Sequence, residues 1–233
     1  MLPAQDELVR GPEKCGALGA CLLIEPVCST HRKNQYPSQA VVVTTAARNM
    51  IELSKAGEKL KHIVVHGAED PTEHPEFRAI SENLRELTNK WFPRADLVLF
   101  SNARNLEKAD VEIALGLYDK PILRLEAGTQ KTFKALTGLK ASEFKDTVDH
   151  LKKLELERLI LQACFVRGSV DNSTEAELKA WMKHVAEIKP ASVQVYTLPK
   201  AIKDVKPITK SALDKIVAQV NDEVGIPCEI SEL

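Results

Sequence analysis

The stretch K-H-I-V-V-H-G-A-E-D-P-T-E-H-P-E-F, residues 61–77, decides the fold of this chain. Residues 63–65 form a short β-branched apolar run, which predicts a buried strand. The run ends before Gly67, continues as an acidic loop, and gives way to a helical pattern near Pro75. In an α/β protein such a loop lies at the carboxyl end of the sheet, where ligands usually bind. We therefore expect a binding site here, although a plain strand-to-helix connection gives the same pattern.

Strand and helix patterns alternate along the rest of the chain. Short apolar runs predict six strands, at residues 18–24, 61–66, 96–100, 121–126, 158–165 and 192–196, with a short further strand at 225–230. Helical spacing of apolar residues predicts helices at 38–56, 75–90, 106–117, 131–136, 142–154, from Asn172 or Ser173 to 188, and 210–220. Strands that alternate with helices through short connections indicate parallel βαβ units.

Two parallel architectures fit this alternation, a doubly wound open sheet and a parallel (β/α)6 partial TIM barrel. Polar side chains follow five successive strands, and a barrel directs such residues to a common centre. The pattern therefore favours the partial barrel. Because no linker or repeat divides the sequence, we expect one domain over residues 1–233, with residues 1–14 as a lead-in.

Composition excludes several classes of protein. The formal net charge of −1 does not indicate a nucleic-acid binder, which needs concentrated Lys and Arg. No apolar stretch is long enough to span a membrane, and the amino-terminal residues lack the order of a signal peptide. We expect a soluble cytoplasmic protein, in which the five cysteines are thiols and not disulfides.

Four segments resemble motifs of the radical S-adenosylmethionine (SAM) superfamily, in its compact single-domain form. They are H-G-A-E-D-P-T-E-H-P-E-F at 66–77, D-L-V-L-F-S-N at 96–102, D-K-P-I-L-R-L-E-A-G-T-Q-K-T-F at 119–133 and F-V-R-G-S-V-D-N at 165–172. The first is similar to the family's Gly-Gly-Glu-type loop, although G-A-E-D stands where the family has G-x-G-E.

The resemblance implies where two cofactors, SAM and a four-iron, four-sulfur (4Fe-4S) cluster, would bind. The positions that match SAM-contacting motifs are Gly67, Ala68, Glu69, Asp70, Ser101, Asn102, Arg124 and Glu126. Arg167 could hold an acidic group of a substrate, because a guanidinium binds carboxylate or phosphate through two hydrogen bonds.

Family members hold the cluster through three thiolates, usually spaced C-x3-C-x2-C, because soft sulfur ligands suit iron–sulfur clusters. Here Cys28 stands where the first of them would fall, but no further Cys follows it in that loop. Cys15 and Cys21 precede it and complete the candidate set of three metal ligands. The alternative interpretation is that these are buried or incidental thiols.

Two functions follow from the resemblance. The first is reductive cleavage of SAM at the cluster, supported by an electron donor and acting on an unknown substrate. The second is a degenerate member that binds no cluster and serves as a small-molecule or protein-binding module. An ordinary acid–base enzyme using Asp70 and His66 is a third possibility, without a supporting motif. Whether the protein is an enzyme, and which residues would be catalytic, is left open by the sequence.

Overall fold

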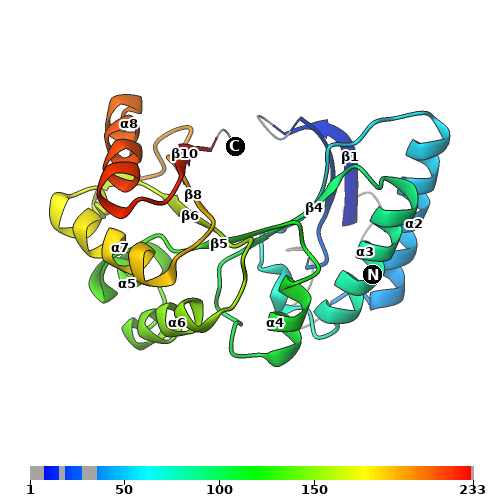
Figure 1. The fold of residues 1–233 in the computed structure, drawn as a ribbon, viewed down its shortest axis with the longest axis horizontal. Helices are drawn as coiled ribbons and strands as arrows, with labels where there is room; N and C mark the ends of the chain where they lie inside the picture. Colours follow the sequence, from blue (N-terminus) through cyan, green and yellow to red (C-terminus); the bar gives the residue numbers. More distant parts are fainter. Residues whose placement is uncertain (1–7, 16–18, 28–35, 232–233) are drawn as a thin grey trace. The chain divides into compact units, whose positions relative to one another are not determined.

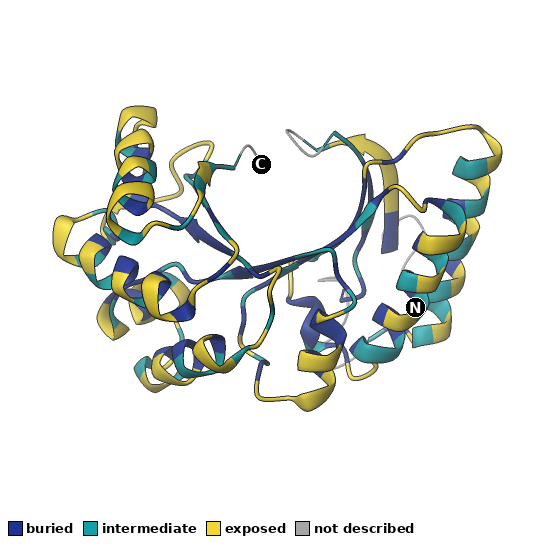
Figure 2. Cartoon of the chain, viewed as in Figure 1, coloured by how far each residue is buried: buried dark blue, intermediate teal, exposed yellow. Residues whose placement is uncertain are grey.

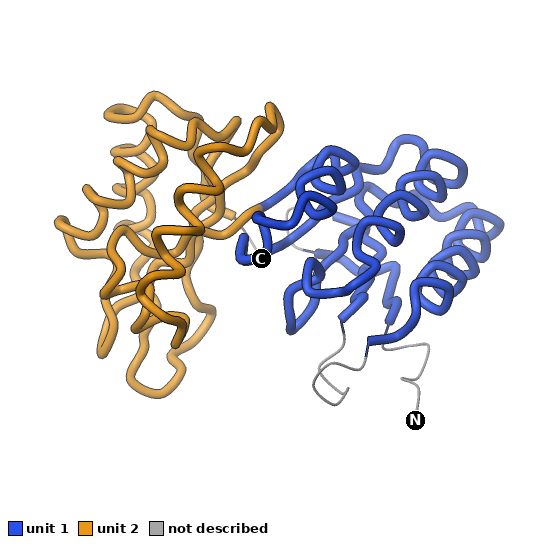
Figure 3. The backbone as a smooth tube through the Cα atoms, turned by 90° about the horizontal axis from the view of Figure 1, so that it is seen from below, with its two compact units in different colours: residues 1–122 blue, residues 123–233 orange. Residues whose placement is uncertain are grey.

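A computed structural model describes residues 8–15, 19–27 and 36–231. The chain forms two compact units, residues 1–122 and residues 123–233 (Figure 3). The single-domain expectation stays a prediction, and each unit is described by itself below. The boundary falls within strand β5 (Lys120–Arg124), so the chain passes from one unit to the other inside a strand.

The first unit is built on four neighbouring strands, in the order β1-β2-β3-β4. β2 (Ala20–Ile24), β3 (His62–Val65) and β4 (Asp96–Ser101) run parallel, and their registers pair Ile24 with Val65 and Val65 with Leu99. β1 (Val9–Lys14) pairs antiparallel with β2. β1 therefore lies in the stretch that was expected to be only a lead-in.

Helices α2 (Gln39–Lys55), α3 (Phe77–Trp91) and α4 (Ala109–Leu115) complete the first unit (Figure 1). Ser38 caps α2 as predicted, because its hydroxyl accepts a hydrogen bond from the backbone N–H of Val41. The predicted apolar stripe of α3 is buried and includes Phe77, Ile80 and Leu84. A short 3-10 helix, η2 (Pro71–Glu73), precedes α3.

The second unit holds strands β6 (Ile160–Cys164), β8 (Ser192–Tyr196) and β10 (Cys228–Ile230), which run parallel. A separate antiparallel pair, β7 (Val166–Gly168) and β9 (Val205–Pro207), was not predicted. Three-residue strands are too short to show a periodic pattern, which explains the omission.

Four helices accompany these strands, α5 (Gln130–Thr137), α6 (Ala141–Lys153), α7 (Glu175–Ile188) and α8 (Lys210–Gln219), with a π-helical turn at Val220–Val224. The predicted cap of α7 is wrong: Thr174, not Asn172 or Ser173, accepts from the backbone N–H of Glu177. The side chain of Asn172 is used elsewhere, as described below.

In each unit, strands and helices differ in how far their residues are buried. Most residues of the parallel strands are buried, whereas the helices contain many exposed residues (Figure 2). Strands covered in this way are continuous apolar runs, which is the pattern that predicted them. In the part of the chain that the structure describes, no helix has the length and apolar character needed to cross a membrane.

Candidate functional site

Asp70 joins the two predicted loops of the first unit. Its Oδ1 atom accepts hydrogen bonds from the Thr72 backbone N–H at 2.9 Å and from the Ser101 hydroxyl at 3.1 Å. The Thr72 hydroxyl also donates to Oδ1, and the backbone N–H of Asn102 donates to Oδ2. Asp70 is only 7% exposed. The loop after β3 and the end of β4 therefore meet through a carboxylate whose two oxygens are bound within the protein.

Close backbone packing explains the glycine of this loop. A side chain at Gly67 would place its Cβ atom 2.7 Å from the Glu69 carbonyl oxygen and 3.0 Å from that of Val27, too close for any larger residue. Ala68 and Glu69, in contrast, are exposed. Of the predicted positions in the first unit, Asp70 and Ser101 are thus buried in the junction and Glu69 faces solvent.

The remaining predicted cofactor positions lie in the second unit. Arg124 ends β5 and Glu126 follows two residues later, so both point to one side of the strand. The Leu125 backbone N–H donates to Gln162 O, which sets Arg124 and Glu126 on the same side as Gln162 and Cys164 of β6. The parallel register of β6 and β8 then pairs these with Gln194 and Tyr196.

These side chains form one surface, which we call the polar face. It consists of Arg124, Glu126, Gln162, Cys164, Gln194 and Tyr196. α7 lies on the opposite side of the strands, because Trp181 packs edge-on against Phe165 and its Nε1 atom donates to Leu125 O at 2.7 Å. In Figure 1 helices α5 to α8 all lie on that side, so no helix of this unit covers the polar face.

Buried hydrogen bonds fix the strand ends that carry the polar face. The Asn172 side-chain amide donates to Glu126 O and to Cys164 O, both at 2.7 Å, and its Oδ1 accepts from Val166 N. Asn172 thus ties β5 to β6 directly beneath Glu126 and Cys164. Gly128 packs so closely on α7 that an added Cβ would lie 2.3 Å from Glu177 O. The R-L-E-A-G segment therefore has a packing role as well as a place in the site.

The titratable groups of the polar face have pKa values that differ from those of solvent-exposed groups. Burial raises the pKa of the Glu126 carboxyl, and the charge of Arg124 opposes that rise. Burial, with a smaller contribution from Glu126, raises the pKa of the Cys164 thiol to about 12. Burial also raises the pKa of the Tyr196 hydroxyl, and Tyr196 lies level with Cys164 in the strand register. Cys164 and Tyr196 are consequently neutral hydrogen-bonding groups at neutral pH.

Arg167 lies apart from these groups. It is an exposed residue of β7, paired with Lys206 of β9. Its predicted role in holding a substrate stays a prediction.

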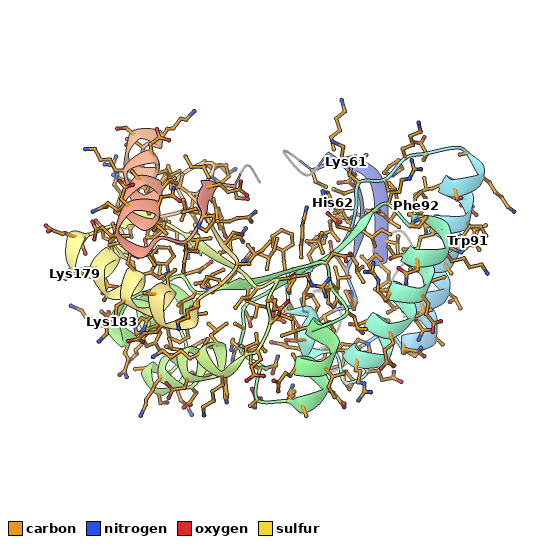
Figure 4. The ribbon with its side chains drawn as sticks, viewed as in Figure 1. Lys61, His62, Trp91, Phe92, Lys179 and Lys183 are labelled. Atoms are coloured by element: carbon orange, nitrogen blue, oxygen red, sulfur yellow. The ribbon has the colours of Figure 1, made fainter. Side chains whose placement is uncertain are left out.

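The described cysteines of the first unit lie at the amino end of the sheet. Cys21 is the second residue of β2, and Cys15 follows Lys14, which pairs with the first residue of β2. Cys21 is paired with His62, the first residue of β3, labelled in Figure 4. Burial and a hydrogen bond with Cys15 raise the pKa of the Cys21 thiol to about 12. Cys28 lies outside the described residues.

Several solved structures with the same fold are described as radical SAM proteins. A radical SAM methyltransferase from Sphaerobacter thermophilus matches 91% of this chain and 65% of its own length, with a TM-score of 0.64 and 12% identity. Coproporphyrinogen III oxidase from Escherichia coli, described as a radical SAM enzyme, matches 95% of this chain and 55% of its own, with a TM-score of 0.57 and 11% identity. The chain has the radical SAM fold. The predicted α/β class, a parallel (β/α)6 partial TIM barrel, is therefore confirmed.

The chain covers different shares of the proteins that it matches. A domain of pyruvate-formate lyase-activating enzyme from Bacteroides vulgatus is covered over 96% of its length, with a TM-score of 0.54 and 10% identity. The chain spans about two thirds of the methyltransferase and about half of the oxidase. No protein-family model and no curated protein matches the sequence.

The described thiols do not fit the cluster of the radical SAM fold. That cluster needs three thiolates in one loop at the carboxyl end of the sheet, whereas Cys15 and Cys21 lie at its amino end. Within residues 8–15, 19–27 and 36–231, no three Cys, His, Asp or Glu side chains are grouped to hold a metal ion. The three-cysteine set as a whole stays a prediction.

Gln162 and Tyr196 are among the polar residues that the sequence placed at the ends of five successive strands, but neither was assigned to the candidate site. The structure puts both on the same surface as Arg124 and Glu126, together with Cys164, which is buried. A detectable signal was present, since Q-A-C and Q-V-Y carry polar residues at alternate positions of otherwise apolar strands.

Proposed function

We propose that this chain is a small-molecule-binding protein with a radical SAM fold, which binds its ligand without assembling an iron–sulfur cluster. The observation that carries the proposal is the placement of the thiols. Cys15 and Cys21 lie at the amino end of β2, and the loop at its carboxyl end contributes only Cys28. SAM is the first ligand to test, because the matched structures are radical SAM proteins.

Within this proposal the two units have different tasks. The Asp70 junction holds the loop after β3 against the end of β4, because its carboxylate is already bound by Thr72, Ser101 and Asn102. The polar face has charged and uncharged groups turned away from the helices, so it is the surface that can contact a ligand. Asn172 positions it by fixing the backbone under Glu126 and Cys164.

The competing candidate is reductive cleavage of SAM at a cluster. The fold and the order of motifs favour it. It requires two thiolates in addition to Cys28, which the described residues at the carboxyl end of the sheet do not provide.

Anaerobic reconstitution with iron and sulfide separates the two candidates. We expect no thiolate–iron absorption band and no deoxyadenosine after SAM and a reductant are added. A stable band that is lost in Cys28→Ser and retained in Cys228→Ser would overturn the cluster-free proposal. Cys228→Ser is the matched control, because its thiol is outside the polar face, at the first residue of β10.

A further inference from the structure

The antiparallel pair of β7 and β9 carries two like charges directly opposite one another. Its register pairs Arg167 with Lys206, and both residues are exposed. Opposed residues of an antiparallel pair lie on the same side, with their Cβ atoms about 5 Å apart, so two cations there repel one another. Among the described residues, no carboxylate forms an ion pair with either of them. The strand pair therefore presents two uncompensated positive charges to solvent.

The hairpin that leads into β9 adds further cations. Residues 198–210 contain four lysines and a single acidic residue, Asp204, in a chain whose formal net charge is −1. Lys200 and Lys203 are exposed. Lys203 has a φ of 53°, a left-handed backbone conformation that glycine, asparagine and aspartate adopt far more readily than lysine. The turn thus holds a lysine where a less strained residue would form the same backbone, which indicates a use for its charge.

The residue before Lys203 is apolar and exposed. Ile202 leaves 53% of its surface to solvent, the largest exposed fraction of any large apolar residue described. Removing such a side chain from water is favourable, so an apolar contact at Ile202 would stabilise a complex. We call Arg167, Lys200, Ile202, Lys203 and Lys206 the basic hairpin.

Hydrogen bonds fix the backbone of the basic hairpin. Ile202 and Val205 exchange two backbone hydrogen bonds across the turn, at 2.9 Å and 3.0 Å. The Ser169 backbone N–H donates to Asp204 O at 3.1 Å, and a Cβ added at Gly168 would lie 2.1 Å from the same oxygen. The turn is therefore fastened to β7. A surface whose backbone is already fixed loses little conformational entropy when a partner binds.

We propose that the basic hairpin is a docking surface for an acidic segment of another protein, one that also carries apolar side chains. The partner's carboxylates accept hydrogen bonds from the Arg167 guanidinium and from the Lys203 and Lys206 ammonium groups, which relieves the repulsion between like charges. An apolar side chain of the same segment covers Ile202. This inference goes beyond small-molecule binding by the polar face and does not depend on it.

The exposed apolar residue distinguishes such a partner from a nucleic acid. A phosphate backbone would neutralise the cations but would leave Ile202 without an apolar contact. Single-stranded nucleic acids also bind by stacking their bases on aromatic side chains. Residues 166–168 and 198–210 contain no Phe, Tyr or Trp. Charge and apolar surface together therefore favour an acidic peptide.

Fluorescence anisotropy of a labelled peptide, titrated with the full chain, tests the inference. The probe is a twelve-residue peptide that repeats Glu-Glu-Leu. The matched probes repeat Gln-Gln-Leu, which lacks the charge, and Glu-Glu-Ser, which lacks the apolar side chain. We expect the Glu-Glu-Leu peptide to bind, with an affinity that falls as salt is added, and each matched probe to bind at least about tenfold more weakly. A twelve-nucleotide single-stranded RNA is titrated in parallel.

Two double charge reversals locate the binding. Arg167→Glu with Lys206→Glu should weaken binding of the Glu-Glu-Leu peptide at least about tenfold, because it replaces two attractions by repulsions. Lys179→Glu with Lys183→Glu is the control, since it makes the same change of net charge at exposed positions of α7 (Figure 4). It should leave binding nearly unchanged. Melting curves confirm that each protein is folded, and Arg167→Gln with Lys206→Gln replaces a reversal that does not fold.

The contrary outcomes are distinct. If the two double variants weaken binding equally, or if the Glu-Glu-Leu peptide does not bind, the inference is overturned. Binding of the RNA in place of the peptide would assign the surface to nucleic acid and overturn it as well. None of these results bears on small-molecule binding, because neither the probes nor the variants involve the polar face.

Discussion

The two strand ends predicted to contact a cofactor differ in how their carboxylates are used. Asp70, in the first unit, accepts four hydrogen bonds from Thr72, Ser101 and Asn102. Glu126, in the second unit, is partly buried, and its carboxylate accepts no hydrogen bond from the residues described. A carboxylate saturated by its own protein supports structure, whereas one left open beside Arg124 can bind a ligand. Similar positions in a motif therefore need not have similar roles.

We expect the largest change in stability from a substitution at Asp70, because its carboxylate already accepts hydrogen bonds from its own protein. Asp70→Asn replaces an acceptor oxygen by a donor that faces the Asn102 N–H or the Ser101 hydroxyl. We expect a loss of about 3 kcal/mol in unfolding free energy, because buried partners are left unsatisfied. Urea denaturation measures it.

Glu69→Gln is the matched control, because Glu69 is the exposed carboxylate next to Asp70. It should leave the denaturation midpoint unchanged. Equal midpoints for Asp70→Asn and Glu69→Gln would show that the junction does not stabilise the first unit.

Asn172→Ala should have the next largest effect, and in the second unit. It removes three buried hydrogen bonds that hold the strand ends beneath Glu126 and Cys164. We expect about 2 kcal/mol of destabilisation and weaker ligand binding in the folded protein. Asn83→Ala removes one amide contact on α3 and serves as the control. It should leave ligand binding unchanged. If Asn172→Ala binds the ligand as tightly as the wild type, Asn172 does not position the site.

A smaller, pH-dependent effect is expected at Glu126. Its folded-state pKa is raised above 4.5, so the folded protein retains a proton that the unfolded chain releases. Stability therefore falls as pH rises from about 4.5 through the raised pKa, and Glu126→Gln abolishes that fall. Thermal melts of both proteins from pH 4 to pH 8 give the difference. A wild-type curve parallel to that of Glu126→Gln would show that the carboxyl is not perturbed.

The smallest effect concerns reactivity and leaves stability unchanged. Burial and Cys15 raise the pKa of the Cys21 thiol to about 12, so little thiolate is present at neutral pH. Iodoacetamide at pH 7.5 should modify Cys15, which is partly exposed, well before Cys21. Peptide mass spectrometry measures both rates. Faster labelling of Cys21 than of Cys15 would contradict the burial of Cys21 at the amino end of β2.

Most of the fold could be predicted from local patterns. The apolar runs located the parallel strands, and Ser38 with the stripe on α3 located two helices, because these signals lie within one element. β1 was missed since V-R-G-P-E-K lacks alternation and only its first residue is buried. The cap of α7 was misplaced because D-N-S-T offers four capping residues, and a distant strand takes Asn172.

The site could be predicted only in part, for a similar reason. The motif resemblance identified Asp70, Arg124 and Glu126 as candidates. It could not show that Thr72 and Asn102 donate hydrogen bonds to the Asp70 carboxylate. Nor could it show that Gln162 lies beside Arg124 and Glu126. Those facts depend on which strands become neighbours, and strand pairing is not encoded in any one segment.

Calorimetric titration of SAM into iron-free, chelator-treated protein separates cluster-free binding from cluster-dependent binding. We expect binding without iron, weakened at least about tenfold by Glu126→Gln and unchanged by Glu69→Gln. Binding that appears only after iron and sulfide are supplied, or that Glu126→Gln leaves intact, would contradict it.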